Sequence, residues 1–274
     1  MFARNGVGRA ALRVSLSVGL ALAMLGCGSK PTTRRASTST SRPARSTTTA
    51  APSSSVVPAP TTSTITSTTI ASSSRAARYV PLFPFANLQE VADWQQSYGR
   101  DHQHWRLDAG QTALAFAHFL GYAGIDRVVA VSSDTKGAHV AVGFATEGGQ
   151  RGTAALVHLI RYGSGENVPW EVVGTDDTTF ALESPTYGAT VRSPVRVGGH
   201  ITGVDESIAV HIQQLHANGF LGERCCVAAG GLNSPWNVPV SFGPPTDPVL
   251  IISASTGGHL RPVERFAVTA VRYG

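Results

Sequence analysis

The sequence contains little lysine, methionine or cysteine, and this scarcity says something about its origin. Among 274 residues there are 2 methionines and 3 cysteines. Lysine occurs only at Lys30 and Lys136, so arginine supplies almost all of the 22 basic residues. Together with the many alanines and glycines, this usage indicates a GC-rich genome, and we expect an actinobacterial source.

Acidic residues are absent from the N-terminal stretch, so the net charge of the whole chain is misleading. Residues 1–77 contain nine of the 22 lysines and arginines and no aspartate or glutamate. Residues 78–274 hold the other 13 basic residues and all 17 acidic residues, a formal charge of −4. Because a nucleic-acid-binding domain needs a basic face, this balance argues against a nucleic-acid partner.

A long apolar run is also missing. The run from Val14 to Leu25 is too short for a permanent span of the ~30 Å hydrocarbon layer, which takes about 20 helical residues. Arginines at positions 4, 9 and 13 precede it and small residues follow it. This order is typical of a secretory signal peptide, which we expect over residues 1–27.

The apolar run ends in Met24-Leu25-Gly26-Cys27, which resembles a bacterial lipobox. The resemblance implies a diacylglycerol thioether on Cys27 and a lipoprotein anchored to the extracytoplasmic face of the cell membrane. The alternative is cleavage after Ala21-Leu22-Ala23, which would leave a soluble protein with a free Cys27. We favour lipidation, because a lone cysteine at this position needs a reason.

Residues 28–77 contain no aromatic side chain and few branched aliphatic ones. Serine, threonine, proline and alanine dominate, with scattered arginines. Such a segment cannot bury enough apolar surface to offset its conformational entropy. We therefore expect a disordered Ser/Thr/Pro-rich linker that holds the folded domains away from the membrane.

Helical patterns open the folded part, and strand patterns follow. Asn87 with Glu90, and Asp108 with Gln111, have the spacing of helix capping boxes. Apolar residues recur behind them at helical intervals, and alternation then predicts an antiparallel meander. For residues 78–183 we expect an α+β domain with two helices on one antiparallel sheet, in the order of a cystatin-like cone. The predicted strands are residues 128–132, 140–144, 153–162 and 170–173.

Residues 184–274 predict an all-β immunoglobulin-like sandwich of about seven strands. The Ser184-Pro185 and Ser193-Pro194 pairs suit strand starts and edges, because proline has no N–H to donate. We expect a first strand that breaks at the second pair and passes from one sheet to the other. Asn218-Gly219 is typical of a tight hairpin.

The same segment resembles the immunoglobulin-like domain of bacterial spore-germination and sporulation proteins, the Gmad domain. The resemblance implies a non-catalytic extracytoplasmic module and does not imply sporulation. Gly257-Gly258 departs from the family's Asp-Gly, and Cys225-Cys226 is unusual in it. The matching elements are Ser184-Pro185-x-x-Gly188-x-x-Val191-x-Ser193-Pro194-Val195-x-Val197-x-Gly199, Glu206, Asn218-Gly219, the Gly231…Trp236…Phe242 spacing and Ser255-x-Gly257.

The adjacent cysteines Cys225 and Cys226 invite a redox or metal interpretation. Consecutive Cα atoms lie about 3.8 Å apart, whereas disulfides usually join Cα atoms about 4.4–6.8 Å apart. We therefore expect an unbridged structural pair. A strained internal bridge, a metal site and an intermolecular bond are the alternatives.

Residues 101–105, Asp-His-Gln-His-Trp, form the most site-like stretch. His102 and His104 lie on one side only if the segment is extended, and a zinc site needs three or four ligands. No second cluster of cysteine or histidine has a suitable spacing. We expect a polar loop between helices and no metal. One alternative is metal ligation. The other is a contact with a partner or ligand through His102, His104 and Trp105.

Gly174-Thr175-Asp176-Asp177 carries paired carboxylates, but no calcium-loop pattern surrounds them, so we expect a solvated turn. Nucleophile motifs and glycine-rich phosphate loops are absent from the sequence. We therefore expect neither catalysis nor a cofactor.

The sequence as a whole predicts a non-catalytic cell-envelope lipoprotein, a binding or scaffold module for an envelope protein or a wall polymer. One alternative is a small-ligand carrier that takes a lipid or glycan into the α+β domain, near Trp105, His158 or Trp170. The other is a hydrolase or metalloenzyme whose site is assembled across the fold.

Overall fold

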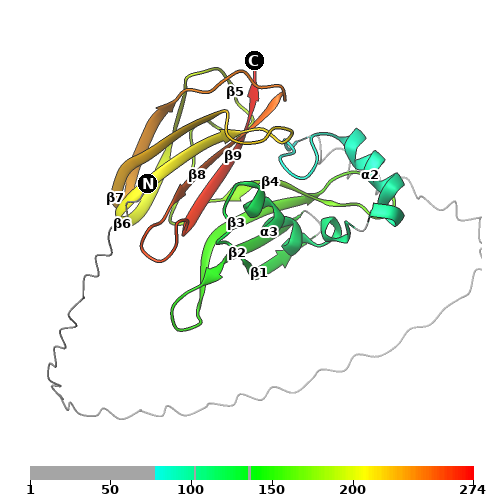
Figure 1. Ribbon diagram of the computed structural model, residues 1–274, viewed down its shortest axis with the longest axis horizontal. Helices are drawn as coiled ribbons and strands as arrows, with labels where there is room; N and C mark the ends of the chain where they lie inside the picture. The colour runs from blue at the N-terminus through cyan, green and yellow to red at the C-terminus, as the bar shows by residue number, and fades with distance from the viewer. Residues whose placement is uncertain (1–77, 102, 135–136) are drawn as a thin grey trace, which may run out of the picture. The chain divides into compact units, whose positions relative to one another are not determined.

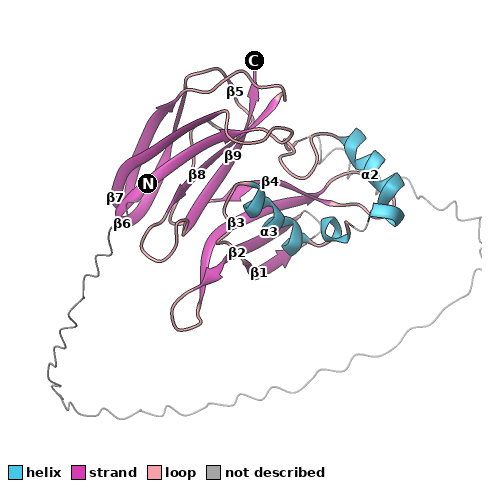
Figure 2. Cartoon of the chain, in the orientation of Figure 1, coloured by secondary structure: helices cyan, strands magenta, loops and turns pink. Residues whose placement is uncertain are grey.

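The computed structural model describes residues 78–101, 103–134 and 137–274 (Figure 1). The expected signal peptide, Cys27 and the linker lie outside the described residues, as does His102. The described part is predominantly β, with two sheets (Figure 2). Its helical elements are α2 (Leu88–Asp101), the short 3-10 helix η1 (His104–Leu107) and α3 (Ala109–Phe119).

The helix starts are those that the capping patterns predict. The side chain of Asn87 accepts a hydrogen bond from the Glu90 N–H at 3.1 Å, and Glu90 accepts one in return from the Ala86 N–H at 2.8 Å. The carboxylate of Asp108 accepts one from the Gln111 N–H at 2.8 Å. These bonds satisfy N–H groups that have no partner within the helix, so both predicted helix starts are confirmed. The reciprocal bond of a capping box is not made at Asp108, because the Asp108 N–H donates to the Trp105 carbonyl at 3.1 Å.

The first sheet is an antiparallel meander in the order β1-β2-β3-β4, as the alternation predicts. Its strands begin and end within a few residues of the predicted ones. Short turns join β1 to β2 and β2 to β3, and a longer connection of residues 162–169 joins β3 to β4. The strands are β1 (Arg127–Ser133), β2 (Ala138–Ala145), β3 (Arg151–Arg161) and β4 (Trp170–Asp176).

The expected cone, with both helices on one sheet face, is wrong. Phe116 of α3 packs in one core with Leu159 of β3, whereas Trp94 of α2 packs in a separate cluster with Ile160. Successive strand residues point to opposite faces, so Leu159 and Ile160 place the two helices on opposite sides of the sheet. The face that holds α3 is also covered by side chains of the second sheet, among them Phe266.

The second sheet has the order β5-β9-β8-β6-β7. The strand break at Ser193-Pro194 is confirmed, since it separates β5 from β6. Both strands nevertheless belong to one five-stranded sheet, so the expected seven-stranded sandwich of two sheets is wrong. The strands are β5 (Thr190–Val191), β6 (Val195–Gln213), β7 (Gly222–Val240), β8 (Val249–Thr256) and β9 (Arg265–Tyr273).

A long hairpin covers the core that the second sheet of a sandwich was expected to cover. Strands β6 and β7 have 19 residues each and run side by side (Figure 1), with register shifts between Ile201 and Glu206. Such irregularities let a strand bend. Val197 in the first half of β6 and Val210 in the second half therefore reach one core, where both meet Leu250 of β8. The Asn218-Gly219 pair lies in a connection of residues 214–221, longer than a two-residue turn.

Candidate functional site

An open cleft of about 460 Å³ lies where β3 and β4 meet the segment before β5 and strand β9. It brings together His158, which is a candidate ligand contact from the sequence, and Gly174, Thr175 and Asp177 of the stretch with paired carboxylates. Its other walls come from residues far away in the sequence. The side chains that matter for the argument are Tyr79, His158, Thr175, Asp177, Glu183 and Tyr187.

Hydrogen bonds hold the walls of the cleft in place. The hydroxyl of Tyr187 accepts a bond from the Val80 N–H at 2.7 Å and donates one to the Val80 carbonyl at 3.2 Å. The hydroxyl of Thr175 accepts a bond from the N–H of Val268 at 2.8 Å. These contacts join the N-terminal segment to the segment before β5, and β4 to β9, so the cleft is largely formed before any ligand arrives.

Two histidines and a carboxylate form one cluster beside the cleft. The register of β2 and β3 pairs His139 with His158, and the two rings stack with centroids 4.6 Å apart. Nδ1 of His139 is hydrogen-bonded to Oδ2 of Asp176, and Nδ1 of His158 lies 3.9 Å from Oδ1. The rings of Tyr79 and His158 form a T-shaped contact, with centroids 5.4 Å apart. Asp176 therefore serves chiefly to orient His139.

His158 is the titratable group of this cluster that lines the cleft. Burial lowers the pKa of its imidazole, and His139 acts in the same direction, while Asp176 partly opposes them. A lowered pKa favours the neutral ring at neutral pH. His158 then offers one hydrogen-bond donor and one acceptor without adding positive charge to the cleft.

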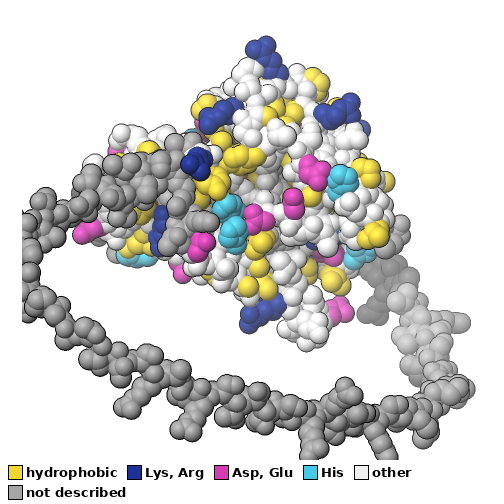
Figure 3. Space-filling view, turned by 180° about the vertical axis from the view of Figure 1, so that it is seen from behind, with side chains coloured by type: hydrophobic (Ala, Val, Ile, Leu, Met, Phe, Trp, Pro, Cys, Tyr) yellow, Lys and Arg dark blue, Asp and Glu magenta, His cyan; other side chains and the backbone are white. Residues whose placement is uncertain are grey.

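Carboxylates give the cleft its charge. Asp177 is exposed at its edge, and Glu183 accepts from Nδ1 of His200 at 2.9 Å. Within the described residues, no lysine or arginine lines the cleft. Figure 3 shows histidine and acidic side chains next to each other on one face, with lysines and arginines scattered over it. The cleft is thus an acidic, aromatic-walled site.

The hydroxyl of Thr175 is engaged by the backbone of Val268, so it is not poised as a nucleophile beside His158. In the part of the chain that the structure describes, no group of three or more histidine, cysteine or acidic side chains could hold a metal ion. What remains are hydrogen-bonding groups, two carboxylates and two tyrosine rings around an open volume.

The histidine and tryptophan predicted in the loop between helices lie in η1 and do not line this cleft. The hydroxyl of Tyr98 and Nδ1 of His104 are 2.7 Å apart. Trp105 stacks on Phe83, with centroids 5.9 Å apart, and the guanidinium of Arg106 lies 5.3 Å from the Trp105 ring. These contacts belong to the aromatic packing around the helices.

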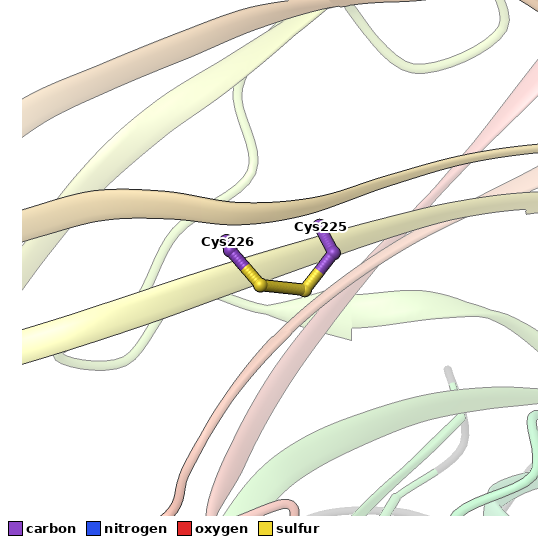
Figure 4. The surroundings of a disulfide bond; sticks show 2 residues. All are labelled: Cys225 and Cys226. Atoms are coloured by element: carbon purple, nitrogen blue, oxygen red, sulfur yellow. A yellow bond between two sulfur atoms is a disulfide. The ribbon is translucent and has the colours of Figure 1, made fainter.

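The adjacent cysteines are bridged, so the expected unbridged pair is wrong. Cys225 and Cys226 form a disulfide in β7 (Figure 4). Their strand pairs Val227 with Ile208 and Arg224 with Val210, which leaves the two cysteines opposite Ala209 alone. The bridge therefore sits in a β-bulge, where Cys226 has a positive φ of 69°. Both cysteines are exposed.

Sequence reasoning missed most of the cleft. No sequence pattern identifies Tyr79, His139, Glu183 or Tyr187 as a site residue. The alternating pattern of β2 and β3 could have placed His139 and His158 on exposed faces. Only the strand register, which the sequence does not state, could have made them neighbours.

No family model matches the chain, and comparisons with curated proteins and with solved structures give no match either. Among the described residues, no helix is long and apolar enough to cross a membrane.

Proposed function

We propose that the protein is a non-catalytic cell-envelope lipoprotein whose folded part binds a wall polymer in this cleft. The observation that carries the proposal is the open acidic cleft around His158, Asp177 and Glu183, bounded by two tyrosines. The proposed lipid anchor on Cys27 rests on the sequence patterns described above. An anchored protein with a linker of about fifty residues would hold such a cleft within reach of wall material.

The geometry supports this function better than it supports a small-ligand carrier. A carrier of the expected kind needs room on the sheet face that α3 covers. Phe116, Val140 and Val157 on that face are fully buried against one another. The open volume lies at the edge of the sheet, where a polymer can enter and leave along its length.

The test is crosslinking in cells of the full-length protein, followed by mass spectrometry of the captured material. We expect wall glycan fragments on the wild type and few of them on the Cys27→Ala protein. They should also be lost from the cleft variant Asp177→Asn/Glu183→Gln. The matched control is Glu147→Gln/Glu166→Gln, which neutralises two exposed carboxylates outside the cleft.

Two results would overturn the proposed function. One is capture that is the same for the cleft variant and for the control. The other is turnover of an envelope substrate by the purified protein that the cleft variant abolishes, since that would make the site catalytic.

A further inference from the structure

The charge of the cleft has no counter-charge among the residues that line it. Nothing in the described part of the chain pairs with the carboxylate of Asp177 through a hydrogen bond or an ion pair. Among the same described residues, Glu183 pairs only with the imidazole of His200. The remaining carboxylate nearby, that of Asp176, is already engaged by His139. Two carboxylates are therefore available to a cationic ligand.

The aromatic walls favour the same kind of ligand. Tyr187 is 43% exposed although its hydroxyl is bound to Val80, so its ring rather than its hydroxyl is presented. The ring of Tyr79 also lines the cleft, where it contacts His158. The face of a tyrosine ring attracts a cation electrostatically, and the attraction is stronger when the cation loses water. Apolar C–H groups of a ligand can also cover such a ring.

From these two features we propose that the cleft recognises the primary ammonium group of an amino sugar within a glycan strand. The ammonium group lies between Asp177 and Glu183, and the sugar ring lies against the tyrosines. The neutral imidazole of His158 and the hydroxyl of Thr186 hydrogen-bond its hydroxyls. This inference rests on the proposed function and specifies its ligand.

A pair of matched oligosaccharides tests the amine directly. The probes are a β-1,4-linked glucosamine tetramer and the same tetramer with every amine acetylated, which keeps the backbone and removes the charge. Isothermal titration with the full chain near neutral pH should show the glucosamine tetramer binding at least about tenfold more tightly, a difference of ~1.4 kcal/mol. Added salt should weaken the binding of the glucosamine tetramer only.

Variants then locate the binding. Asp177→Asn/Glu183→Gln should lower the affinity for the glucosamine tetramer by about tenfold or more, whereas Glu147→Gln/Glu166→Gln should leave it unchanged. Both variants replace carboxylates by amides of the same shape at exposed positions, so thermal melting should report folded proteins. A tetralysine peptide is the third probe and should bind more weakly than the glucosamine tetramer.

Each contrary result has a distinct meaning. If the two tetramers bind equally well and the cleft variant binds neither, recognition of the amine is overturned and the proposed function still stands. If tetralysine binds as tightly as the glucosamine tetramer, the claim that the cleft recognises a sugar is overturned. Absence of binding by both tetramers, or equal effects of the cleft and control variants, overturns the inference itself. The proposed function falls only if crosslinking in cells is also independent of the cleft.

Discussion

The hydroxyl of Tyr187 is bonded to both polar backbone groups of Val80, a residue 107 positions earlier in the chain. It accepts from the N–H at 2.7 Å and donates to the carbonyl at 3.2 Å. Val80 is buried, so no water can readily replace these bonds. One phenol thereby joins the segment before α2 to the segment before β5, and it forms one wall of the cleft.

Replacing Tyr187 by phenylalanine should therefore destabilise the protein. The Tyr187→Phe variant keeps the ring but leaves a buried N–H and carbonyl without their partner, which typically costs about 1–3 kcal/mol. Urea unfolding should show a lower midpoint with an unchanged slope. Tyr98→Phe is the control, because it removes a hydroxyl that bonds to the exposed His104 and should cost less than about 0.5 kcal/mol. Equal losses in the two variants would contradict the assignment.

A second expectation concerns Glu171, whose carboxyl is completely buried. Burial raises the pKa of Glu171 well above its usual range, although hydrogen bonds from backbone N–H groups, among them that of Phe85, partly oppose this. The folded state then holds a proton that the unfolded state releases. Stability should fall as the pH rises from the ordinary glutamate pKa of about 4.3 towards the raised value.

The Glu171→Gln variant should lack this fall, since the amide does not titrate. Compared with the wild type, it should gain in relative stability as the pH rises. Urea unfolding over a series of pH values measures the difference, and Glu147→Gln, at an exposed position, should run parallel to the wild type. A Glu171→Gln curve that also runs parallel to the wild type would mean that the carboxyl ionises normally in the folded protein.

The helix starts and strand patterns of this fold were predictable because they depend on residues close together in the sequence. The side chains of Asn87 and Asp108 cap the helices that immediately follow them, and β2 alternates in apolar character along its own length. Ser193-Pro194 separates β5 from β6, because proline has no N–H to donate to a neighbouring strand. Pro235 and Pro239 are tolerated inside β7, which lies at the edge of its sheet.

The partners of these elements were not predictable from the same information. Leu250 and Ile251 of β8 are both buried, one in the core of the long hairpin and the other in the core that contains α3. The unbroken apolar run in β8 was a sign of burial on both faces, but it did not say what would cover each face. The bulges that bend β6 and the register that stacks His139 on His158 depend on the paired strand. The cleft depends on all of these, so most of its residues were missed.

A third expectation follows from the close approach of β2 and β3 at Gly143. A Cβ added there would lie 1.7 Å from the carbonyl oxygen of Gly152, which is backbone and cannot move aside without disturbing the strand pair. Gly143→Ala should therefore lower stability by at least about 2 kcal/mol or prevent folding, as overpacked sites do. Gly124→Ala is the control, since nothing lies within 4 Å of the added atom. Thermal melting of the two proteins should separate them clearly; similar melting temperatures would mean that the strands are paired differently.

The last expectation concerns the bridge between Cys225 and Cys226, which lies on an exposed part of the edge strand β7. Dithiothreitol should reduce it in the folded protein, and iodoacetamide should then add two labels to the peptide that carries both residues. Because the bridge closes a loop of adjacent residues, it removes little entropy from the unfolded chain. Its reduction should cost no more than about 1 kcal/mol of stability.

Mass spectrometry of the digested protein checks this labelling, and the Cys225→Ser/Cys226→Ser variant provides the unlabelled control. Labelling of the wild type before any reductant is added would show that the thiols are unbridged. Labelling that requires denaturant as well as reductant would show that the bulge is shielded from solvent. Labelling after reduction alone, with the melting temperature nearly unchanged, is the outcome that an exposed bridge in a β-bulge requires. It would also show that this strand tolerates either redox state without unfolding the core beneath it.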